Sequence, residues 1–301
     1  SVFTNLSKDH LDFHGSFENY RLAKSKLFST LEISRKKSKF PTAILNMDDK
    51  HWKYFSDSTK ANVITYGIEN SEADIFADDI VQWSDGSTFM LSTATEIIEA
   101  SVPLPGIFNV SNATAALTIG VLLDMDIENL TSALAKCHGV PGRMEKISGA
   151  PFEVIVDYAH TPEAMRLVLN TLRSVVENRI IVVFGCAGER SLDRRKGLGE
   201  VVSELADFSF ITEEDPRSED SNAIIAEIAD IMMYQGSVEN DDFLRIQDRE
   251  KAIQSALEIA EAGDLILIAG KGHEQSIERF DGSYEWDDRK IARQKISEIF
   301  Q

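Results

Sequence analysis

The sequence Phe208-Ser-Phe-Ile-Thr-Glu-Glu-Asp-Pro-Arg-Ser-Glu-Asp220 joins a short apolar run to a loop of charged residues. The apolar run has the length and composition of a buried β-strand. In the loop, Pro216 fixes a turn and removes one backbone donor, while Arg217 places a permanent planar cation among acidic neighbours. Two interpretations follow: a solvated turn that leads into a helix near residues 222–234, or a ligand loop in which Arg217 binds a carboxylate.

The same order of apolar run and polar loop recurs in the second half of the chain. The runs at 153–156, 180–184 and 265–269 are followed by Asp157-Tyr-Ala-His160, Gly185-Cys-Ala-Gly-Glu-Arg190 and Gly270-Lys-Gly-His-Glu274. Thr161 and Pro162 begin a helix after the first of these loops, in the N-cap and N1 positions. Alternating strands and helices predict a parallel α/β sheet. Such sheets bind ligands at the carboxyl ends of their strands, so we expect the loops to converge on one crevice.

The first half of the chain predicts a separate α/β domain. Strands at 42–45 and 62–66 flank a helix at about 48–55, which indicates half of a parallel sheet. Residues 73–100 are typical of an antiparallel hairpin or meander. The glycines and the proline of Gly139-Val-Pro-Gly-Arg143 interrupt regular structure, so the predicted domains are residues 1–142 and 143–301.

Composition excludes several classes of function. Of 301 residues, 43% are apolar and 27% charged, which is ordinary for a globular protein, and no stretch of about 18 apolar residues could span a membrane. A net charge of −19 opposes binding to a phosphate backbone. Cys137 and Cys186 are too few for a disulfide framework and lack metal-ligand spacing, as expected in a reducing cytosol. We therefore expect a cytoplasmic protein without nucleic-acid or membrane partners.

One predicted helix in the first domain carries a lysine among apolar residues. Ser16 is a candidate N-cap. Apolar positions then recur at helical steps: Tyr20, Ala23, Leu27, Phe28 and Leu31. Lys24 falls on the same stripe. Its side chain must either snorkel to water or lie desolvated as a neutral amine with a lowered pKa, able to form a carbamate with carbon dioxide.

Other polar residues in both domains are candidates for ligand binding. A hard cation such as Mg²⁺, with Zn²⁺ as the rival, could be held by Asp9, His10, Asp12 and His14. Asn109 and Asn112 lie at the start of an Ala-rich helix, where they could cap it or recognise a base or ribose. The loops of the second domain mix cations with carboxylates, which suits a zwitterionic substrate: Asp157, His160, Arg190, Arg217, Lys271, His273 and Glu274.

Several segments of the chain stand in the order found in one known family. They are Thr4-Asn-Leu-Ser-Lys-Asp-His-Leu-Asp-Phe-His-Gly15, Asn19-Tyr-Arg-Leu-Ala-Lys24, Phe108-Asn-Val-Ser-Asn112, Pro141-Gly-Arg-Met-Glu145, Val156-Asp-Tyr-Ala-His-Thr-Pro162, Asp215-Pro-Arg-Ser-Glu-Asp220 and Gly270-Lys-Gly-His-Glu274. Together they resemble the Mur ligases, in particular the branch that makes UDP-N-acetylmuramoyl-tripeptide. The resemblance implies the C-terminal part of a P-loop-type central domain followed by a Rossmann-like α/β C-terminal domain. It also implies ATP-dependent addition of a diamino acid to UDP-MurNAc-L-Ala-D-Glu through an acyl phosphate, with Mg²⁺, by a cytoplasmic monomer.

The resemblance also implies roles for single residues. Lys24 would become a carbamate that supports Mg²⁺, and His10 would bind a second Mg²⁺. The resemblance implies that Asn109 and Asn112 lie near the nucleotide. Arg143 would contact a phosphate, and Asp157 would contact the ribose. Positions that would hold the incoming amino acid are Arg190, Glu214, Asp215, Pro216, Arg217, Gly270 and Glu274. Because both domains would contact one ATP, the linker from Gly139 to Arg143 is expected to act as a hinge.

Two departures from the family pattern bear on specificity and activity. The diaminopimelate form of the loop reads Asp-Asn-Pro-Arg, but here it is Glu214-Asp-Pro-Arg217. Arg217 favours diaminopimelate, whereas the acid at Asp215 would repel a carboxylate and leaves lysine or another diamine open. The chain also has no G-x-x-G-K-[ST] phosphate-binding loop, so we expect it to be inactive by itself. Alternative hypotheses are a related ligase of the folylpolyglutamate synthase or cyanophycin type, and a non-catalytic module that binds nucleotide or amino acid.

Overall fold

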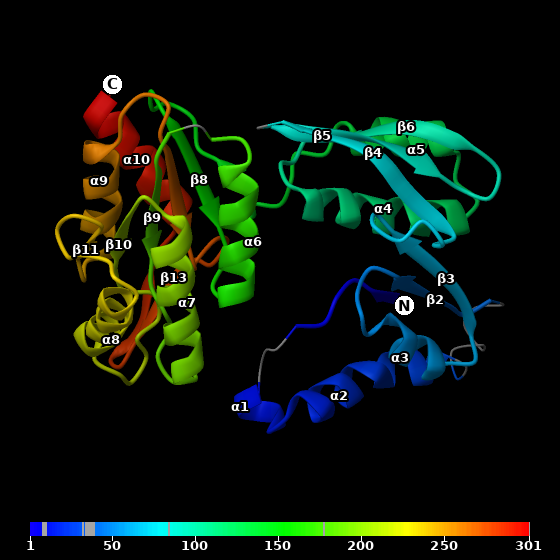
Figure 1. Ribbon diagram of the computed structural model, residues 1–301, viewed down its shortest axis with the longest axis horizontal. Helices are drawn as coiled ribbons and strands as arrows, with labels where there is room; N and C mark the ends of the chain where they lie inside the picture. Colours follow the sequence, from blue (N-terminus) through cyan, green and yellow to red (C-terminus); the bar gives the residue numbers. More distant parts are fainter. Residues whose placement is uncertain (8–10, 32, 34–39, 84, 177, 301) are drawn as a thin grey trace. The chain divides into compact units, whose positions relative to one another are not determined.

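The computed structural model describes residues 1–7, 11–31, 33, 40–83, 85–176 and 178–300, and it forms two compact units, Ser1–His138 and Gly139–Gln301 (Figure 1). Each unit has its own sheet and its own hydrophobic core. In the described part of the chain, no helix combines the length and the apolar composition that crossing a membrane requires.

The first unit is built around a six-stranded sheet whose strands follow the order of the sequence. They are β1 (Val2–Phe3), β2 (Thr42–Asn46), β3 (Asn62–Gly67), β4 (Ile75–Trp83), β5 (Gly86–Ser92) and β6 (Ile97–Val102). Neighbours from β1 to β4 are parallel, and β4, β5 and β6 form an antiparallel meander. The strands predicted at 42–45 and 62–66 and the meander predicted within 73–100 are therefore confirmed.

Helices cover both faces of this first sheet. They are α1 (Leu11–His14), α2 (Phe17–Ser29), α3 (Trp52–Asp57), α4 (Ile107–Leu122) and α5 (Ile127–Leu134). Successive residues of β2 point to opposite faces and so join different cores. Ile44 packs in the core that includes α4 and α5, whereas Leu45 packs with Phe28 of α2 and Phe55 of α3. The sheet is thus a central layer between two pairs of helices.

The second unit has a six-stranded sheet in the order β11-β10-β9-β12-β8-β7. Its strands are β7 (Glu145–Lys146), β8 (Glu153–Asp157), β9 (Ile180–Phe184), β10 (Phe208–Ile211), β11 (Phe243–Arg245) and β12 (Leu265–Ala269). Strands β8 to β12 are parallel, and β7 pairs antiparallel at one edge. The parallel sheet expected for a Rossmann-like domain is therefore confirmed.

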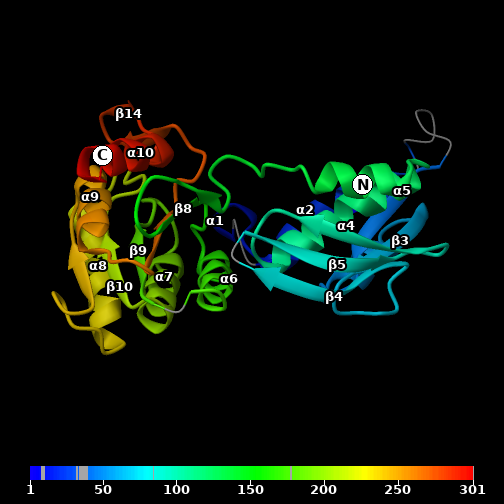
Figure 2. The ribbon, with the colours of Figure 1, turned by 90° about the horizontal axis from the view of Figure 1, so that it is seen from above.

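Helices on both sides of the second sheet explain its sequence pattern. They are α6 (Pro162–Arg173), α7 (Leu192–Leu205), α8 (Ser221–Tyr234), α9 (Arg249–Ile259) and α10 (Asp288–Phe300). Helices α9 and α10 lie on one face of the sheet, and α6 and α7 lie on the other (Figure 2). Because both faces are covered, the central strands β9 and β12 are wholly buried and consist of apolar residues. Thr161 caps α6 and Pro162 occupies its first turn, as predicted.

A small hairpin lies outside this sheet. Strands β13 (Ser276–Arg279) and β14 (Gly282–Glu285) pair antiparallel, with Arg279 opposite Gly282. Gly282 has a positive φ of 146°, which the absence of a Cβ permits. Phe280 and Asp281 form the tip of this hairpin.

Candidate active site

Loops from four strands of the second unit meet at the carboxyl edge of the sheet. The loops after β9 and β10 are joined by Gly188 N, which donates to Asp215 O at 2.8 Å. The loops after β8 and β12 are joined by the Tyr158 hydroxyl, which donates to Glu274 Oε1 at 3.0 Å. The predicted convergence of these loops is therefore confirmed for the second unit.

Gly270 is required where the loop after β12 approaches the loop after β10. Its φ is +112°, in the region that side chains rarely adopt. A Cβ at this position would also lie 2.9 Å from Glu214 Oε2. The lack of a side chain at Gly270 thus allows the backbone of one loop to lie against the carboxyl group of the other.

The loop 212–220 is not a solvated turn. Thr212, Glu213, Glu214 and Asp215 are all less than 9% exposed. Burying so many polar residues is costly unless each is paired or has a ligand. The interpretation of this loop as a plain surface turn is therefore wrong, because the neighbouring loops cover it.

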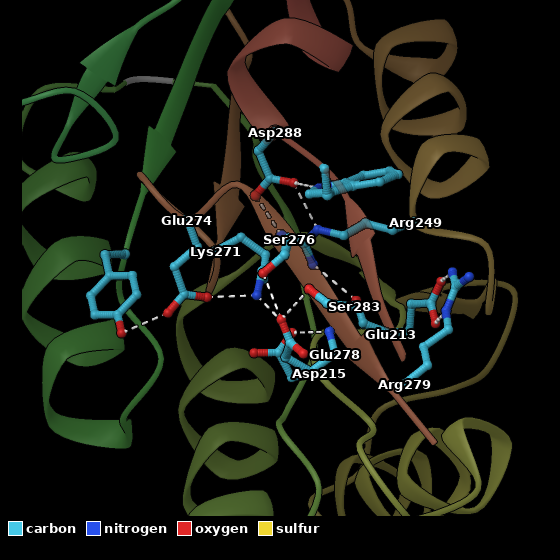
Figure 3. A network of polar contacts seen from close by, with 12 residues as sticks. Glu213, Asp215, Arg249, Lys271, Glu274, Ser276, Glu278, Arg279, Ser283 and Asp288 are labelled. Atoms are coloured by element: carbon cyan, nitrogen blue, oxygen red, sulfur yellow. Dashed lines mark hydrogen bonds and ion pairs between the residues drawn. The ribbon is translucent and has the colours of Figure 1, made fainter. Parts of the chain in front are cut away.

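Asp215 belongs to a buried network of charges (Figure 3). Its Oδ1 accepts from Lys271 Nζ at 2.7 Å and from Glu278 N at 2.9 Å. Lys271, which is 1% exposed, also pairs with Glu274 Oε2 at 2.6 Å. Lys271, which is shared between Asp215 and Glu274, therefore offsets part of the negative charge that would repel an acceptor carboxylate.

Glu214 is a buried carboxyl group at the centre of the converging loops. Burial raises its pKa to about 7, although Arg249 and Lys271 act in the opposite direction. Its Oε2 has no hydrogen-bond partner among the described residues. Glu214 therefore keeps an acceptor oxygen for a donor such as an ammonium group.

Arg217 presents a cation that makes no ion pair among the described residues, although hydrogen bonds from serines, helped by its charge, lower the pKa values of the nearby Glu189 and Glu278. Its backbone is left-handed, with φ of 55°, and its N donates to Glu278 O at 2.9 Å. The side chain is half-buried. It lines a pocket of about 460 Å³ together with Glu213, Pro216, Glu219, Ser221, Gln247, Asp248, Arg279, Phe280 and Asp281. A half-buried guanidinium in such a place is suited to a planar anion such as a carboxylate.

The other predicted residues of the second unit lie near this edge but differ in exposure. Arg190 is half-exposed in the loop after β9. Arg143 is exposed, and its guanidinium carbon lies 4.3 Å from the ring centroid of Tyr158. Asp157 is buried, which raises its pKa, and its oxygens accept from Met144 N and Ala159 N, both at 2.8 Å. The roles implied for these residues toward a nucleotide or an amino acid stay predictions.

In the first unit, the predicted stripe is buried at Tyr20, Phe28 and Leu31, half-buried at Ala23 and exposed at Leu27. The buried residues of α2 are Tyr20, Ser25 and Phe28, while Leu27 is 56% exposed. Lys24 is exposed, with Nζ 5.3 Å from the ring centroid of Tyr20. Of the two alternatives for Lys24, a side chain that reaches water is therefore confirmed, and a desolvated side chain is not. Carbamate formation at Lys24 stays a prediction.

The asparagines predicted near the nucleotide do not cap α4. The N-cap is Gly106, and it makes no side-chain cap bond. Asn109 lies inside the helix and donates from Nδ2 to Pro105 O at 2.8 Å. Asn112 is exposed. The capping interpretation is thus wrong for both residues, and a contact with a base or ribose stays a prediction.

The described residues do not by themselves provide a metal site. Within these residues, no group of three or more His, Cys, Asp or Glu side chains is arranged to hold a metal ion. Asp9 and His10, which were predicted to bind Mg²⁺, lie outside the described residues. Lys24 alone does not fit the ion, since a lysine becomes an oxygen ligand only after conversion to a carbamate.

Arg249 is a positioning residue that the sequence did not reveal. It is fully buried and pairs with Asp288 at 2.7 Å. It also donates to the carbonyls of Glu213 and Ala269, which precede Glu214 and Gly270 (Figure 3). An arginine in the first turn of a helix is usually solvated, so nothing in the sequence indicated that Arg249 would be buried against the loops.

Comparisons of the sequence with known proteins all indicate the same family. Residues 1–120 match the sequence model of the Mur ligase middle domain, and residues 142–272 match that of the Mur ligase glutamate ligase domain. The chain is 41% identical over 300 residues to the UDP-N-acetylmuramoyl-L-alanyl-D-glutamate--2,6-diaminopimelate ligase of Bacillus velezensis, covering 99% of this chain and 60% of that protein. It is 40% identical to the UDP-N-acetylmuramyl-tripeptide synthetase of a Roseiflexus species, with the same coverage.

A solved structure supports the same relationship. The structure of a UDP-N-acetylmuramoyl-L-alanyl-D-glutamate--2,6-diaminopimelate ligase is 34% identical and has a TM-score of 0.64, covering 99% of this chain and 60% of that one. The chain therefore spans about 60% of the length of the relatives that it matches.

Proposed function

The chain belongs to the Mur ligase family, and we propose that it forms the middle and C-terminal domains of an ATP-dependent ligase that adds a diamino acid to UDP-MurNAc-L-Ala-D-Glu. Support comes from the relatives named as diaminopimelate ligases, at 41% and 34% identity. The second unit would bind the incoming amino acid. Family membership also supports a cytoplasmic monomer as the working form.

The environment of Arg217 is the observation on which the choice of acceptor rests. The half-buried guanidinium of Arg217 makes no ion pair among the described residues and lines a pocket at the carboxyl edge of the sheet. We infer that it binds the distal carboxylate of meso-diaminopimelate, a group that lysine lacks. The acidic groups of Glu214 and Glu274 lie in adjoining loops, and they would accept from the ammonium of the same molecule.

The acid at position 215 is compatible with a dicarboxylic acceptor. Lys271 pairs with Asp215, and Glu278 N donates to the same oxygen. The carboxylate is therefore engaged inside the protein, and Lys271, which also pairs with Glu274, offsets part of its charge. This pairing weakens the objection that Asp215 raises against diaminopimelate, so the preference over lysine rests on Arg217. Arg190, Pro216 and Gly270 would complete the acceptor site.

ATP and Mg²⁺ are the proposed cofactors. Bound ATP would supply the phosphoryl group that activates the substrate carboxylate. Asn109, Asn112, Arg143 and Asp157 would contact the nucleotide, with Arg143 as an exposed cation for a phosphate. His10 and a carbamate of Lys24 would be the protein ligands of Mg²⁺, an ion that usually has few protein ligands and keeps several waters.

Amino-acid-dependent phosphate release tests the proposal. The assay uses the full-length ligase that contains this chain, with UDP-MurNAc-L-Ala-D-Glu, ATP and Mg²⁺, and adds either meso-diaminopimelate or L-lysine. We expect turnover with diaminopimelate and little with lysine, because Arg217 has a partner only in the first case. Turnover with lysine but not with diaminopimelate would reject the specificity, and turnover with neither would reject the proposed reaction.

A further inference from the structure

The β13–β14 hairpin lies beyond both segments that match the family, which end at residues 120 and 272. We propose that this hairpin is a specificity-determining wall of the acceptor pocket, placed so that it selects for a distal carboxylate on the incoming amino acid. The inference rests on the proposed function, and it assigns a role to residues that no sequence motif includes.

Three contacts dock the hairpin on the loop after β10. Arg217 N donates to Glu278 O at 2.9 Å, and Glu278 N donates to Asp215 Oδ1 at 2.9 Å. The guanidinium of Arg279 pairs with the buried carboxylate of Glu213 (Figure 3). The backbone of Arg217 therefore lies beside β13, where Arg217 and Arg279 form an isolated parallel bridge.

This docking fixes the backbone from which the Arg217 side chain projects. A left-handed arginine is unfavourable by itself, so surrounding contacts must hold it in place. The bond from Arg217 N to Glu278 O is one such contact, and it comes from the hairpin. The position of the guanidinium in the pocket consequently depends on β13.

The hairpin also forms one side of the pocket itself. Arg279, Phe280 and Asp281 line it on the hairpin side, while Ser221 and Asp248 line it at the N-termini of α8 and α9. The Ser221 side chain is buried, and its Oγ has no partner among the described residues. A hydroxyl donor without a partner favours an anion, whereas the N-termini of α8 and α9 are already capped by the carboxylates of Asp220 and Asp248. The Ser221 hydroxyl thus adds to Arg217 in selecting a carboxylate.

Most other charges around the pocket already have partners. Arg279 pairs with Glu213, and Glu219 pairs with Arg195. Asp281 accepts from the Tyr284 hydroxyl at 2.6 Å, and Asp248 pairs with Lys251 at 3.6 Å. Among the described residues that line the pocket, Arg217 is thus the cation that makes no ion pair. A new charge at the hairpin tip would act on that ligand directly.

Phe280 allows this inference to be tested without unfolding the protein, because it is 86% exposed. Phe280→Glu places a negative charge beside the bound carboxylate, and Phe280→Lys places a positive one. Tyr234→Glu is the matched control, since Tyr234 is 89% exposed at the last residue of α8 and does not line the pocket. Calorimetry on the 301-residue chain gives Kd for meso-diaminopimelate and for L-lysine.

We expect Phe280→Glu to weaken diaminopimelate binding about threefold and leave lysine binding unchanged, as charges partly screened by water do. Phe280→Lys should strengthen diaminopimelate binding by a similar factor, and Tyr234→Glu should change neither Kd. Equal changes for both amino acids, or no change, would overturn the role of the hairpin while the proposed function stands. Binding of neither amino acid by the unmodified chain would overturn the proposed function and the inference with it.

Discussion

Arg217 combines an unfavourable left-handed backbone with a cation that makes no ion pair among the described residues. Proteins keep such a combination where the surrounding structure enforces it, and functional sites are the usual place. Asp215, two residues earlier, has the opposite character, because its carboxylate accepts from Lys271 Nζ and from Glu278 N inside the protein. One loop thus holds Arg217, whose side chain is available to a ligand, and Asp215, whose side chain is bound within the protein.

Replacing Arg217 by lysine tests the bidentate contact. Arg217→Lys keeps the charge but loses the planar fork, so Kd for meso-diaminopimelate should rise about tenfold, while Kd for L-lysine stays the same. Calorimetry measures both values. Arg245→Lys, at an exposed ion pair with Glu239, is the control and should have no effect. An equal rise in both Kd values would mean that Arg217 binds the part common to the two amino acids.

Glu214 should make stability depend on pH. Folding raises its pKa from 4.5 to about 7, so the folded state holds the proton more tightly than the unfolded state. The contribution of Glu214 is favourable while it is protonated and declines as pH rises from about 4.5 to about 7, by up to about 3 kcal/mol.

Urea denaturation between pH 5 and 8 measures this effect. Glu214→Gln has no proton to lose, so the free energy of unfolding of this variant should fall less over the same range than that of the unmodified chain. Parallel pH profiles for the two proteins would show that Glu214 titrates normally.

At the carboxyl edge of the second sheet, the backbone of Gly270 packs against the side chain of Glu214, and a substitution of Gly270 tests this packing. Gly270→Ala introduces both backbone strain and a contact with Glu214 Oε2, since the Cβ would lie 2.9 Å from it. Gly236→Ala introduces strain alone, because φ is 102° there and nothing lies within 4 Å of the new Cβ.

We expect Gly270→Ala to cost about 1–3 kcal/mol more in the free energy of unfolding than Gly236→Ala. Urea denaturation at pH 7 gives both values. If the two variants lose the same stability, the approach of the two loops is looser than the structure indicates.

Two helices hold the strand ends through one buried ion pair. Arg249 of α9 and Asp288 of α10 are both fully buried, and the Trp286 indole donates to the same Asp288 at 2.8 Å. Removing one partner leaves an unpaired buried charge, whereas removing both does not.

A double-mutant cycle measures this coupling. Arg249→Met and Asp288→Leu should each lower the free energy of unfolding by about 3–5 kcal/mol, and the double variant should lose clearly less than their sum. Trp286 fluorescence follows unfolding next to the pair. Additive losses would show that the pair does not hold the loops together.

At the scale of the whole molecule, contacts with the second unit restrict the C-terminal part of the linker Gly139 to Arg143, which was predicted to act as a hinge. Gly142 N donates to Glu145 Oε2 at 2.7 Å, and a Cβ on Gly142 would lie 2.2 Å from the backbone of Gly272. Met144 N is likewise bound to Asp157. Gly142 and the residues after it are thus fixed to the second unit, so a hinge would have to lie before them. Hinge motion itself stays a prediction.

The chain by itself should not catalyse the ligation. It spans about 60% of its relatives and contains no G-x-x-G-K-[ST] loop for the phosphates of ATP. Incubation of the isolated chain with ATP, Mg²⁺, UDP-MurNAc-L-Ala-D-Glu and diaminopimelate should therefore give no tripeptide product by mass spectrometry, while the full-length ligase serves as the positive control. Measurable product from the isolated chain would contradict the expectation.

Local sequence determined the strands, several caps and the site loops of this protein. Apolar runs such as Ile180–Phe184 predict buried strands because both faces of a parallel sheet are covered, and Thr161-Pro162 predicts a helix start from adjacent residues alone. The convergence of the loops followed from parallel topology. These features depend on neighbouring residues or on a general rule of sheets.

Tertiary structure alone decided what the charged residues do. Asp215 and Lys271 are 56 residues apart, and Glu213 and Arg279 are 66 apart, so no local pattern links them. The exposure of Lys24 also depends on which face of α2 packs, and that choice is made by α3 and the sheet. The physical reason is that hydrophobic periodicity acts over one or two turns, whereas ion pairs and burial depend on which distant segments the fold brings together.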